Sequence, residues 1–312
     1  MNCVFHALSN HVKNIYMKRS KNFLVRLLLK YSKRYFPEKV YSFILFIRGF
    51  KKFKKQINKE KSFKKFSNGL DRINEHEYKI TSQNNEDGII EYIFDKIPNQ
   101  KYFIEIGFGY FECNSLNLIK NGWRGKLIDY STEECLLIKS MLKHFFSNSE
   151  VAVENKKIDR DNINQILSEN LQERTIDFFS LDVDGNDYWI LKNLKSDNIK
   201  VICCEYNHWM GNDAKKTIPY NPNHEYKHDE HKRIGYCGAT LLAIHDLLKK
   251  KGFDLIAVES SGTNAFFVKK EFSNNFEILS PIKSWKSVGR HENETQVKMI
   301  KNNMKKLKFE DV

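Results

Sequence analysis

The sequence of 312 residues is 41% hydrophobic and 13% aromatic, which excludes an intrinsically disordered chain. Its formal net charge of +13 is unevenly distributed, because residues 1–70 hold 18 basic and only two acidic residues. The other 242 residues hold 34 basic and 37 acidic residues, so they carry a net charge of −3. The basic character therefore belongs to the N-terminal stretch, and the remainder lacks the charge expected of a nucleic-acid-binding domain.

Residues 1–75 are predicted to form a basic helical extension. Apolar residues recur at helical spacing among lysines and arginines from Asn22 to Lys65, and Pro37 is expected to separate two helices. Three interpretations stay open: a helical layer packed on the main domain, a peripheral contact with an anionic membrane through residues 1–70, or nucleic-acid binding. The interleaved aliphatic side chains make nucleic acid the weakest of the three.

The expected location is the cytoplasm, with a peripheral contact at the inner face of a membrane. No apolar run approaches the roughly 20 residues that cross a bilayer, and the basic start lacks the pattern of a signal peptide. The six cysteines form no C-x-x-C pair, which favours reduced thiols over a zinc site or a disulfide framework.

A strand followed by a glycine turn opens the main domain, which we place at residues 76–270. Tyr102 to Ile106 is predicted to be a buried strand ending in Gly107-Phe108-Gly109, with Glu105 just before the turn and a helix from Asn114. This order is typical of a nucleotide-binding crossover. Glu112 replaces the third glycine of the dinucleotide fingerprint, which leaves the shorter form used for S-adenosylmethionine. The alternative is an ordinary tight turn.

The second predicted strand, Lys126 to Asp129, brings a carboxylate to its C-terminal end. Asp129 lies 22 residues after Gly107. An acidic residue at about this distance is suited to accept hydrogen bonds from both ribose hydroxyls of a bound cofactor. The alternative is a surface aspartate at a strand end. A helix over Glu133 to His144, a strand over Glu150 to Lys157 and a short helix over Asn162 to Asn170 are expected next.

Two further strands are predicted to bring polar side chains to the same edge of the sheet. One runs from Ile176 into Asp182-Val183-Asp184-Gly185-Asn186-Asp187, and the other runs from Val201 to Glu205 and is followed by Asn207 and His208. Carboxyl ends of parallel strands meet at one edge. Clustered carboxylates in apolar surroundings are costly unless they meet a cation or share protons, so this edge is predicted to be functional.

The rest of the main domain is predicted to be a long polar loop, a helix and a hairpin. The loop runs to about Gly238 and includes His224, His228 and His231, which favour a solvated or substrate-facing loop over a metal site. An amphipathic helix over Ala239 to Lys251 and strands over Asp254 to Glu259 and Asn264 to Lys269 follow. Residues 271–312 are predicted to be a tail with a basic helix.

Seven stretches of the sequence, in order, are SQNNEDGII, FIEIGFG, NGWRGKLID, FFSLDVDGNDYWIL, CEYNH, CGATLLAIHDLLKKKGFDLI and SSGTNAFFV. With them, about residues 80–270 resemble the FkbM-type and related class I S-adenosylmethionine-dependent methyltransferases. The resemblance implies an α/β fold: a Rossmann-like, seven-strand, mostly parallel sheet with helices on both faces and a C-terminal antiparallel hairpin. It implies that Glu105, Gly107 and Gly109 line the methionine and ribose end of S-adenosyl-L-methionine and that Asp129 holds the ribose. Asn114 and Asp182 complete the predicted cofactor-binding set.

The sequence also departs from the family. Phe108 and Phe111 are bulkier than the small residues often found beside the glycines, and Asp129 stands where a glutamate is usual. These departures leave room for a degenerate domain.

The expected activity is O-methylation of a hydroxyl of a sugar, a glycan or a similar small molecule, because members of the family commonly act on such hydroxyls. The predicted catalytic residues are Asp184, His208, Asp187 and Asn207, with Asp184 or His208 as the general base. Asp184 and Glu205 are predicted to hold Mg²⁺. Two alternatives stay open. One is a sugar-nucleotide glycosyltransferase that uses Asp182 and Asp184 as a metal-binding D-x-D string, and the other is an inactive methyltransferase-like scaffold at a membrane surface.

Overall fold

The computed structural model describes residues 38–61, 72–169, 175–224, 235–286 and 294–312. The chain divides into two compact units, Met1–Lys52 and Phe53–Val312. This division falls earlier in the chain than the boundary expected near residue 75, and the second unit includes the predicted tail. The first predicted helix of the extension, before Pro37, lies outside the described residues; helix α3 (Glu38–Ile57) follows it. Among the described helices, none is long and apolar enough to cross a membrane.

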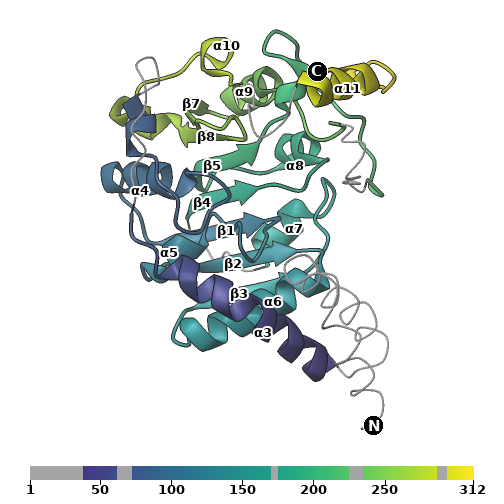
Figure 1. Ribbon diagram of the computed structural model, residues 1–312. Helices are drawn as coiled ribbons and strands as arrows, with labels where there is room; N and C mark the ends of the chain where they lie inside the picture. Colours follow the sequence, from purple (N-terminus) through teal and green to yellow (C-terminus); the bar gives the residue numbers. More distant parts are fainter. Residues whose placement is uncertain (1–37, 62–71, 170–174, 225–234, 287–293) are drawn as a thin grey trace, which may run out of the picture. The chain divides into compact units, whose positions relative to one another are not determined.

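A seven-stranded sheet forms the centre of the second unit (Figure 1), and its order is β3-β2-β1-β4-β5-β8-β7. The first five strands in this order are parallel, whereas β8 runs antiparallel to both β5 and β7. The predicted mostly parallel sheet with a closing antiparallel hairpin is therefore confirmed. The strands are β1 (Tyr102–Ile106), β2 (Arg124–Asp129), β3 (Val151–Asn155), β4 (Ile176–Leu181), β5 (Ile199–Glu205), β7 (Phe253–Val258) and β8 (Asn264–Lys269).

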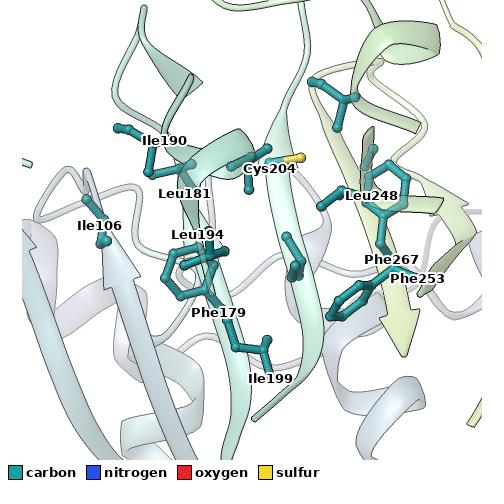
Figure 2. Close-up of a cluster of buried hydrophobic side chains, with 14 of the residues drawn as sticks. Ile106, Phe179, Leu181, Ile190, Leu194, Ile199, Cys204, Leu248, Phe253 and Phe267 are labelled. Atoms are coloured by element: carbon teal, nitrogen blue, oxygen red, sulfur yellow. The ribbon is translucent and has the colours of Figure 1, made fainter. Parts of the chain in front are cut away.

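Helices cover both faces of the sheet, which is why every residue of β1 and β4 is buried. On one face, α7 (Ile163–Ser168), α8 (Asp187–Asn193) and α9 (Leu241–Lys250) pack into one apolar cluster. Figure 2 shows part of it, including Phe179 and Phe267 of the sheet with Ile190 and Leu248 of the helices.

The opposite face is covered by α4 (Glu86–Lys96) and α5 (Leu116–Lys120), while α6 (Thr132–Phe145) packs along β2 and β3. Phe94 of α4 meets Phe178 edge to face, with ring centroids 6.1 Å apart. Consecutive residues of a strand point to opposite faces, so Phe178 and Phe179 serve the two cores separately.

Part of the segment predicted as a long loop has regular structure. A short 3-10 helix, η3 (His208–Met210), is followed by β6 (Lys216–Thr217), which pairs antiparallel with β9 (Glu310–Asp311) near the C-terminus. A two-residue strand has no periodicity that a sequence could show. The remaining elements of this unit are η2 (Arg72–His76), η4 (Lys270–Asn275), α10 (Pro281–Ser284) and α11 (Glu294–Met304).

A buried polar network ties the β7–β8 hairpin to the segment that precedes α4. Glu259, fully buried, accepts a hydrogen bond from Asn85 Nδ2 at 2.8 Å, and Glu86 accepts one from Asn264 Nδ2 at 2.8 Å. Burial, reinforced by the negative charges of Glu86 and Glu77, raises the pKa of Glu259 from 4.5 to about 7.

This network predicts a pH dependence of stability. Because the pKa of Glu259 is higher in the folded than in the unfolded protein, its proton stabilises the folded state fully below about pH 4.5. This contribution, on the order of 3 kcal/mol, is lost as the pH rises through 7. Urea unfolding at pH 5 and at pH 8 should show a smaller drop in the free energy of unfolding for Glu259→Gln than for the wild type. The exposed Glu271→Gln, which changes the charge equally, should behave as the wild type does. Equal drops in all three proteins would contradict the assignment.

Candidate active site

A cavity of about 410 Å³ lies at the carboxyl ends of β1, β2, β4 and β5. Strands β1 and β4 are neighbours in the sheet, and the chain leaves them toward opposite edges, so the cavity sits at the topological switch point of the sheet. The cavity is lined chiefly by residues 105–109, 128–130, 156–158 and 182–184, together with Gln83, Glu112, Asn114, Asn186, Glu205, His224 and Asn264. Its size suits a small-molecule ligand.

The two glycines of the turn after β1 have different roles. Gly107 has a left-handed φ of 77°, and a Cβ added there would lie 1.5 Å from the carbonyl oxygen of Asp182. No side chain fits at this point. Gly109 has no left-handed φ, and its added Cβ would meet Glu112 Cβ at 3.5 Å, an ordinary contact. A close backbone approach within the protein therefore requires glycine at position 107, whereas Gly109 lines the cavity without that constraint.

Glu105 shapes the cavity floor by holding the chain after the glycine turn. Its buried carboxylate accepts hydrogen bonds from the backbone N–H groups of Asn114 at 2.9 Å and Ser115 at 2.7 Å. Burial raises the pKa of Glu105, and these hydrogen bonds oppose that rise. Asn114 in turn donates from Nδ2 to Ser180 Oγ at 3.2 Å, so β1 and β4 are connected across the floor.

Asp129 stands at the end of β2, where the sequence placed it. Its Oδ2 accepts from Phe108 N–H at 3.2 Å and its Oδ1 accepts from Ser131 N–H at 2.6 Å. Each carboxylate oxygen can accept a second hydrogen bond, and Asp129 lines the cavity. Burial raises the pKa of this carboxyl group, an effect that the negative charge of Asp184 increases.

Three carboxylates meet on the other side of the cavity floor. Asp182, Asp184 and Glu205 each offer an oxygen within 4.8 Å of the others. Asp184 has a left-handed φ of 56°, a conformation that Asp tolerates better than most residues and that is frequent at functional sites. Burial and the charge of Glu205 raise the pKa of Asp182 well above its usual value. Asp182 Oδ1 is buried and has no hydrogen-bond partner among the described residues.

Asp187 holds the turn that carries this cluster. It is buried, and its carboxylate accepts from Val183 N–H and Gly185 N–H, both at 2.9 Å. Burial raises its pKa to about 6. These contacts indicate a positioning role, and Asp187 is not among the residues that line the cavity.

Asn207 and His208 lie beyond the end of β5. Asn207 is buried and uses its side chain on the backbone: Nδ2 donates to the carbonyl oxygens of Gly235 and Cys237, each at 2.8 Å, and Oδ1 accepts from Trp209 N–H at 2.9 Å. Neither residue lines the cavity. The arrangement indicates a structural role for Asn207, and the catalytic role of His208 stays a prediction.

The cavity also includes residues that have no catalytic, cofactor-binding or metal-binding role among the predicted site residues. Among them are His224, Asn186, Lys157 and Asn264. Of these four, His224 belongs to the histidine loop that was predicted to be solvated or to face the substrate. His228 and His231 lie outside the described residues. Asn186 belongs to the DGND turn and Asn264 to the NAFFV strand. Both motifs are part of the family resemblance, so the sequence could have indicated these two residues as site residues.

Sheet order, glycine turn and cavity together define a class I S-adenosylmethionine-dependent methyltransferase domain. The sequence model of the methyltransferase FkbM domain matches residues 83–255, which is more than half of the chain. The protein therefore belongs to the FkbM methyltransferase family. This membership favours a methyltransferase over the glycosyltransferase alternative for the D-x-D string. No curated protein sequence matches the chain significantly.

Solved methyltransferase structures resemble the chain at low identity. Magnesium protoporphyrin IX methyltransferase (ChlM) from Synechocystis PCC 6803 with bound S-adenosylhomocysteine is 12% identical with a TM-score of 0.41, covering 74% of this chain and 98% of that one. The N-terminal domain of EvdMO1 with S-adenosylhomocysteine bound is 12% identical with a TM-score of 0.39, covering 71% and 94%. An S-adenosylmethionine-dependent methyltransferase from Clostridium acetobutylicum ATCC 824 is 12% identical with a TM-score of 0.37, covering 59% and 90%.

The two glycines give a matched pair of variants. Gly107→Ala combines a left-handed φ with a collision against the Asp182 carbonyl, so urea unfolding should show a loss of at least about 3 kcal/mol, or no folded protein. Gly109→Ala should change the free energy of unfolding by less than about 1 kcal/mol. Similar losses in both variants would show that the close approach of Gly107 to the Asp182 carbonyl oxygen is not what requires glycine at position 107.

Proposed function

We propose that this FkbM-family protein transfers the methyl group of S-adenosyl-L-methionine to a hydroxyl of a sugar, a glycan or a similar small molecule. The observation that carries the proposal is one cavity with two chemically different sides. Glu105, Gly107 and Asp129 form the side suited to the cofactor, and Asp182, Asp184 and Glu205 form the other side.

The cofactor side is suited to hold the amino-acid and ribose parts of S-adenosylmethionine. Gly107 and Gly109 keep side chains away from the cofactor, Asp129 accepts from the ribose hydroxyls, and Asn114 completes this side. Asp182, whose carbonyl oxygen lies against Gly107, borders both sides and would contact the cofactor from there. The acidic lining favours a sulfonium cation. In the reaction, the acceptor oxygen forms a bond to the methyl carbon while the carbon–sulfur bond breaks. The electron pair of the broken bond stays on the sulfur, so the cofactor leaves as S-adenosylhomocysteine.

A base must take the proton of the acceptor hydroxyl. Asp184 is the proposed base, because it lines the cavity on the side away from the cofactor, where the acceptor would bind. His208, which the sequence also predicts as a base, is the second candidate. Asp187 holds the turn that aims Asp184.

The carboxylate cluster fits a divalent cation such as Mg²⁺. Asp182, Asp184 and Glu205 are oxygen donors of the kind Mg²⁺ prefers, they converge within 4.8 Å, and Asp182 Oδ1 is buried without a partner among the described residues. Asp184 and Glu205 would hold the ion together with Asp182, and the ion would make the acceptor hydroxyl more acidic.

The metal proposal is tested with purified protein, radiolabelled S-adenosylmethionine and a panel of methyl glycosides. Chelation by EDTA should lower methyl transfer at least about tenfold, added Mg²⁺ should restore it, and Asp184→Asn and Glu205→Gln should lower it similarly. Asp161→Asn, the same chemical change at an exposed aspartate, is the control. Undiminished transfer with EDTA and in Glu205→Gln would exclude the metal, whatever the effect of Asp184→Asn, because Asp184 is also the proposed base.

We also propose that residues 1–70 bring the protein to the cytoplasmic face of an anionic membrane. The support is the concentration of 18 basic residues among interleaved aliphatic and aromatic side chains. Nucleic acid is disfavoured as a partner by the same interleaving.

The membrane proposal is tested by sedimentation with liposomes. Full-length protein should bind vesicles that contain phosphatidylserine, and binding should fall as salt rises, because surface charge attraction is screened. A chain lacking residues 1–52, which keeps the second compact unit whole, should not bind, and neither protein should bind neutral phosphatidylcholine vesicles. Equal binding by both proteins would end the proposal.

A further inference from the structure

His224 is a cavity residue with one ring nitrogen, Nε2, that has no hydrogen-bond partner among the described residues. Its half-buried imidazole lines the cavity, and its Nε2 atom is buried without a hydrogen bond in the part of the chain that the structure describes. Burial lowers its pKa, and a hydrogen bond to the Asp184 backbone and the negative charge of Asp184 oppose that shift. A buried polar atom without a partner is destabilising, so a partner from outside the protein would satisfy it.

The chain before His224 is fastened to the turn that carries the carboxylate cluster. Asn186 Nδ2 donates to the Asn221 carbonyl oxygen at 2.7 Å, and Asn221 N–H donates back to Asn186 Oδ1 at 3.3 Å. Lys157 Nζ donates to the Pro222 carbonyl oxygen at 2.6 Å, and His224 N–H donates to the Asn221 carbonyl oxygen at 2.9 Å. His224 is therefore held at a fixed place beside the β4 turn.

The imidazole lies directly against Gly185. A Cβ added at Gly185 would lie 2.2 Å from His224 Cδ2 and 2.8 Å from Nε2. Gly185 does not have a left-handed φ, so its backbone would accept alanine without strain. The three atoms nearest to that added Cβ all belong to the imidazole. The glycine of the DGND turn thus leaves the space that His224 occupies.

We propose that His224 Nε2 hydrogen-bonds the hydroxyl-bearing acceptor and helps to select it. The assignment rests on the proposed O-methylation. The cofactor side of the cavity is formed by the ends of β1 and β2, whereas His224 lies against the β4 turn next to Asp184. An acceptor oxygen must approach the methyl carbon in line with the sulfur–carbon bond, from the side away from the sulfur. His224 is placed to contact the molecule that enters from that side.

The test separates loss of the imidazole from its displacement. His224→Ala removes it, and Gly185→Ala pushes it aside while leaving it in the chain. Transfer of radiolabelled methyl to a panel of methyl glycosides gives KM and kcat for each protein, and calorimetric titration with S-adenosylhomocysteine checks the cofactor side. Each single variant should raise the KM for the glycoside about tenfold, the usual effect of one lost neutral hydrogen bond, with unchanged S-adenosylhomocysteine affinity.

Two further variants exclude a merely structural role. In the double variant Gly185→Ala/His224→Ala, the alanine at position 185 has no imidazole to displace, so the KM should equal that of His224→Ala alone. His224→Gln, which keeps a polar group near the position of Nε2, should recover part of the loss. His144→Ala on α6, a histidine that does not line the cavity, should match the wild type.

The outcomes are distinguishable. Methyl transfer by the wild type with unchanged KM in both single variants would overturn the His224 assignment and leave the proposed function intact. Additive effects in the double variant, or a parallel loss of S-adenosylhomocysteine affinity, would also overturn it. Binding of S-adenosylhomocysteine with no transfer to any glycoside by the wild type would overturn the proposed acceptor class, and the His224 assignment with it.

Discussion

Where β1 and β4 end, the backbone of Gly107 lies so close to the Asp182 carbonyl oxygen that a Cβ would be 1.5 Å from it. Hydrogen bonds from Gly107 N–H to the Ile128 carbonyl oxygen and from Asp182 N–H to the Ile106 carbonyl oxygen, both 2.9 Å, fix the strand ends around this contact. The cavity floor and the two sets of acidic residues around it are positioned by this arrangement. A side chain at position 107 would separate the cofactor side from the carboxylate cluster.

Four acidic residues of the site, three of them buried and Asp182 partly buried, fall into two groups, which their hydrogen bonds distinguish. Glu105, Asp129 and Asp187 each accept backbone N–H groups, and these bonds hold a turn in place. Asp182 instead has one oxygen without a partner among the described residues and lies within reach of two other carboxylates. Burial raises the pKa of all four carboxyl groups, but only at the cluster does charge repulsion contribute as a leading cause. The first group builds the site, and the cluster is the part of it that needs a ligand, a shared proton or a cation.

The sequence predicted the sheet and much of the site because both depend on local patterns. Strands that carry acidic residues at or next to their carboxyl ends follow from apolar runs, turn chemistry and the geometry of parallel sheets. The structure brings these four residues to one cavity: Glu105, Asp129, Asp182 and Glu205. The functions of individual side chains were harder to predict. Glu205 ends β5 and Asn207 follows it two residues later, so the two residues hold similar positions in the sequence. The Asn207 amide, however, donates hydrogen bonds to the backbone carbonyl oxygens of Gly235 and Cys237, which lie far along the chain. His224 reaches the cavity through the Asn186–Asn221 pair, a contact between segments with no shared pattern in the sequence.

The central claim is that the cavity at the ends of β1 and β2 binds the methyl-donor cofactor. An inactive scaffold with a collapsed or degenerate site would not bind that cofactor. Calorimetric titration of the purified full-length protein with S-adenosylhomocysteine tests it most directly, with Asp129→Asn and the exposed Asp161→Asn measured alongside. The structure predicts micromolar binding by the wild type and by Asp161→Asn, with affinity at least about tenfold weaker in Asp129→Asn, because hydrogen bonds to a charged acceptor are the stronger ones. A folded wild-type protein that does not bind, or an Asp129→Asn variant that binds equally well, would contradict it.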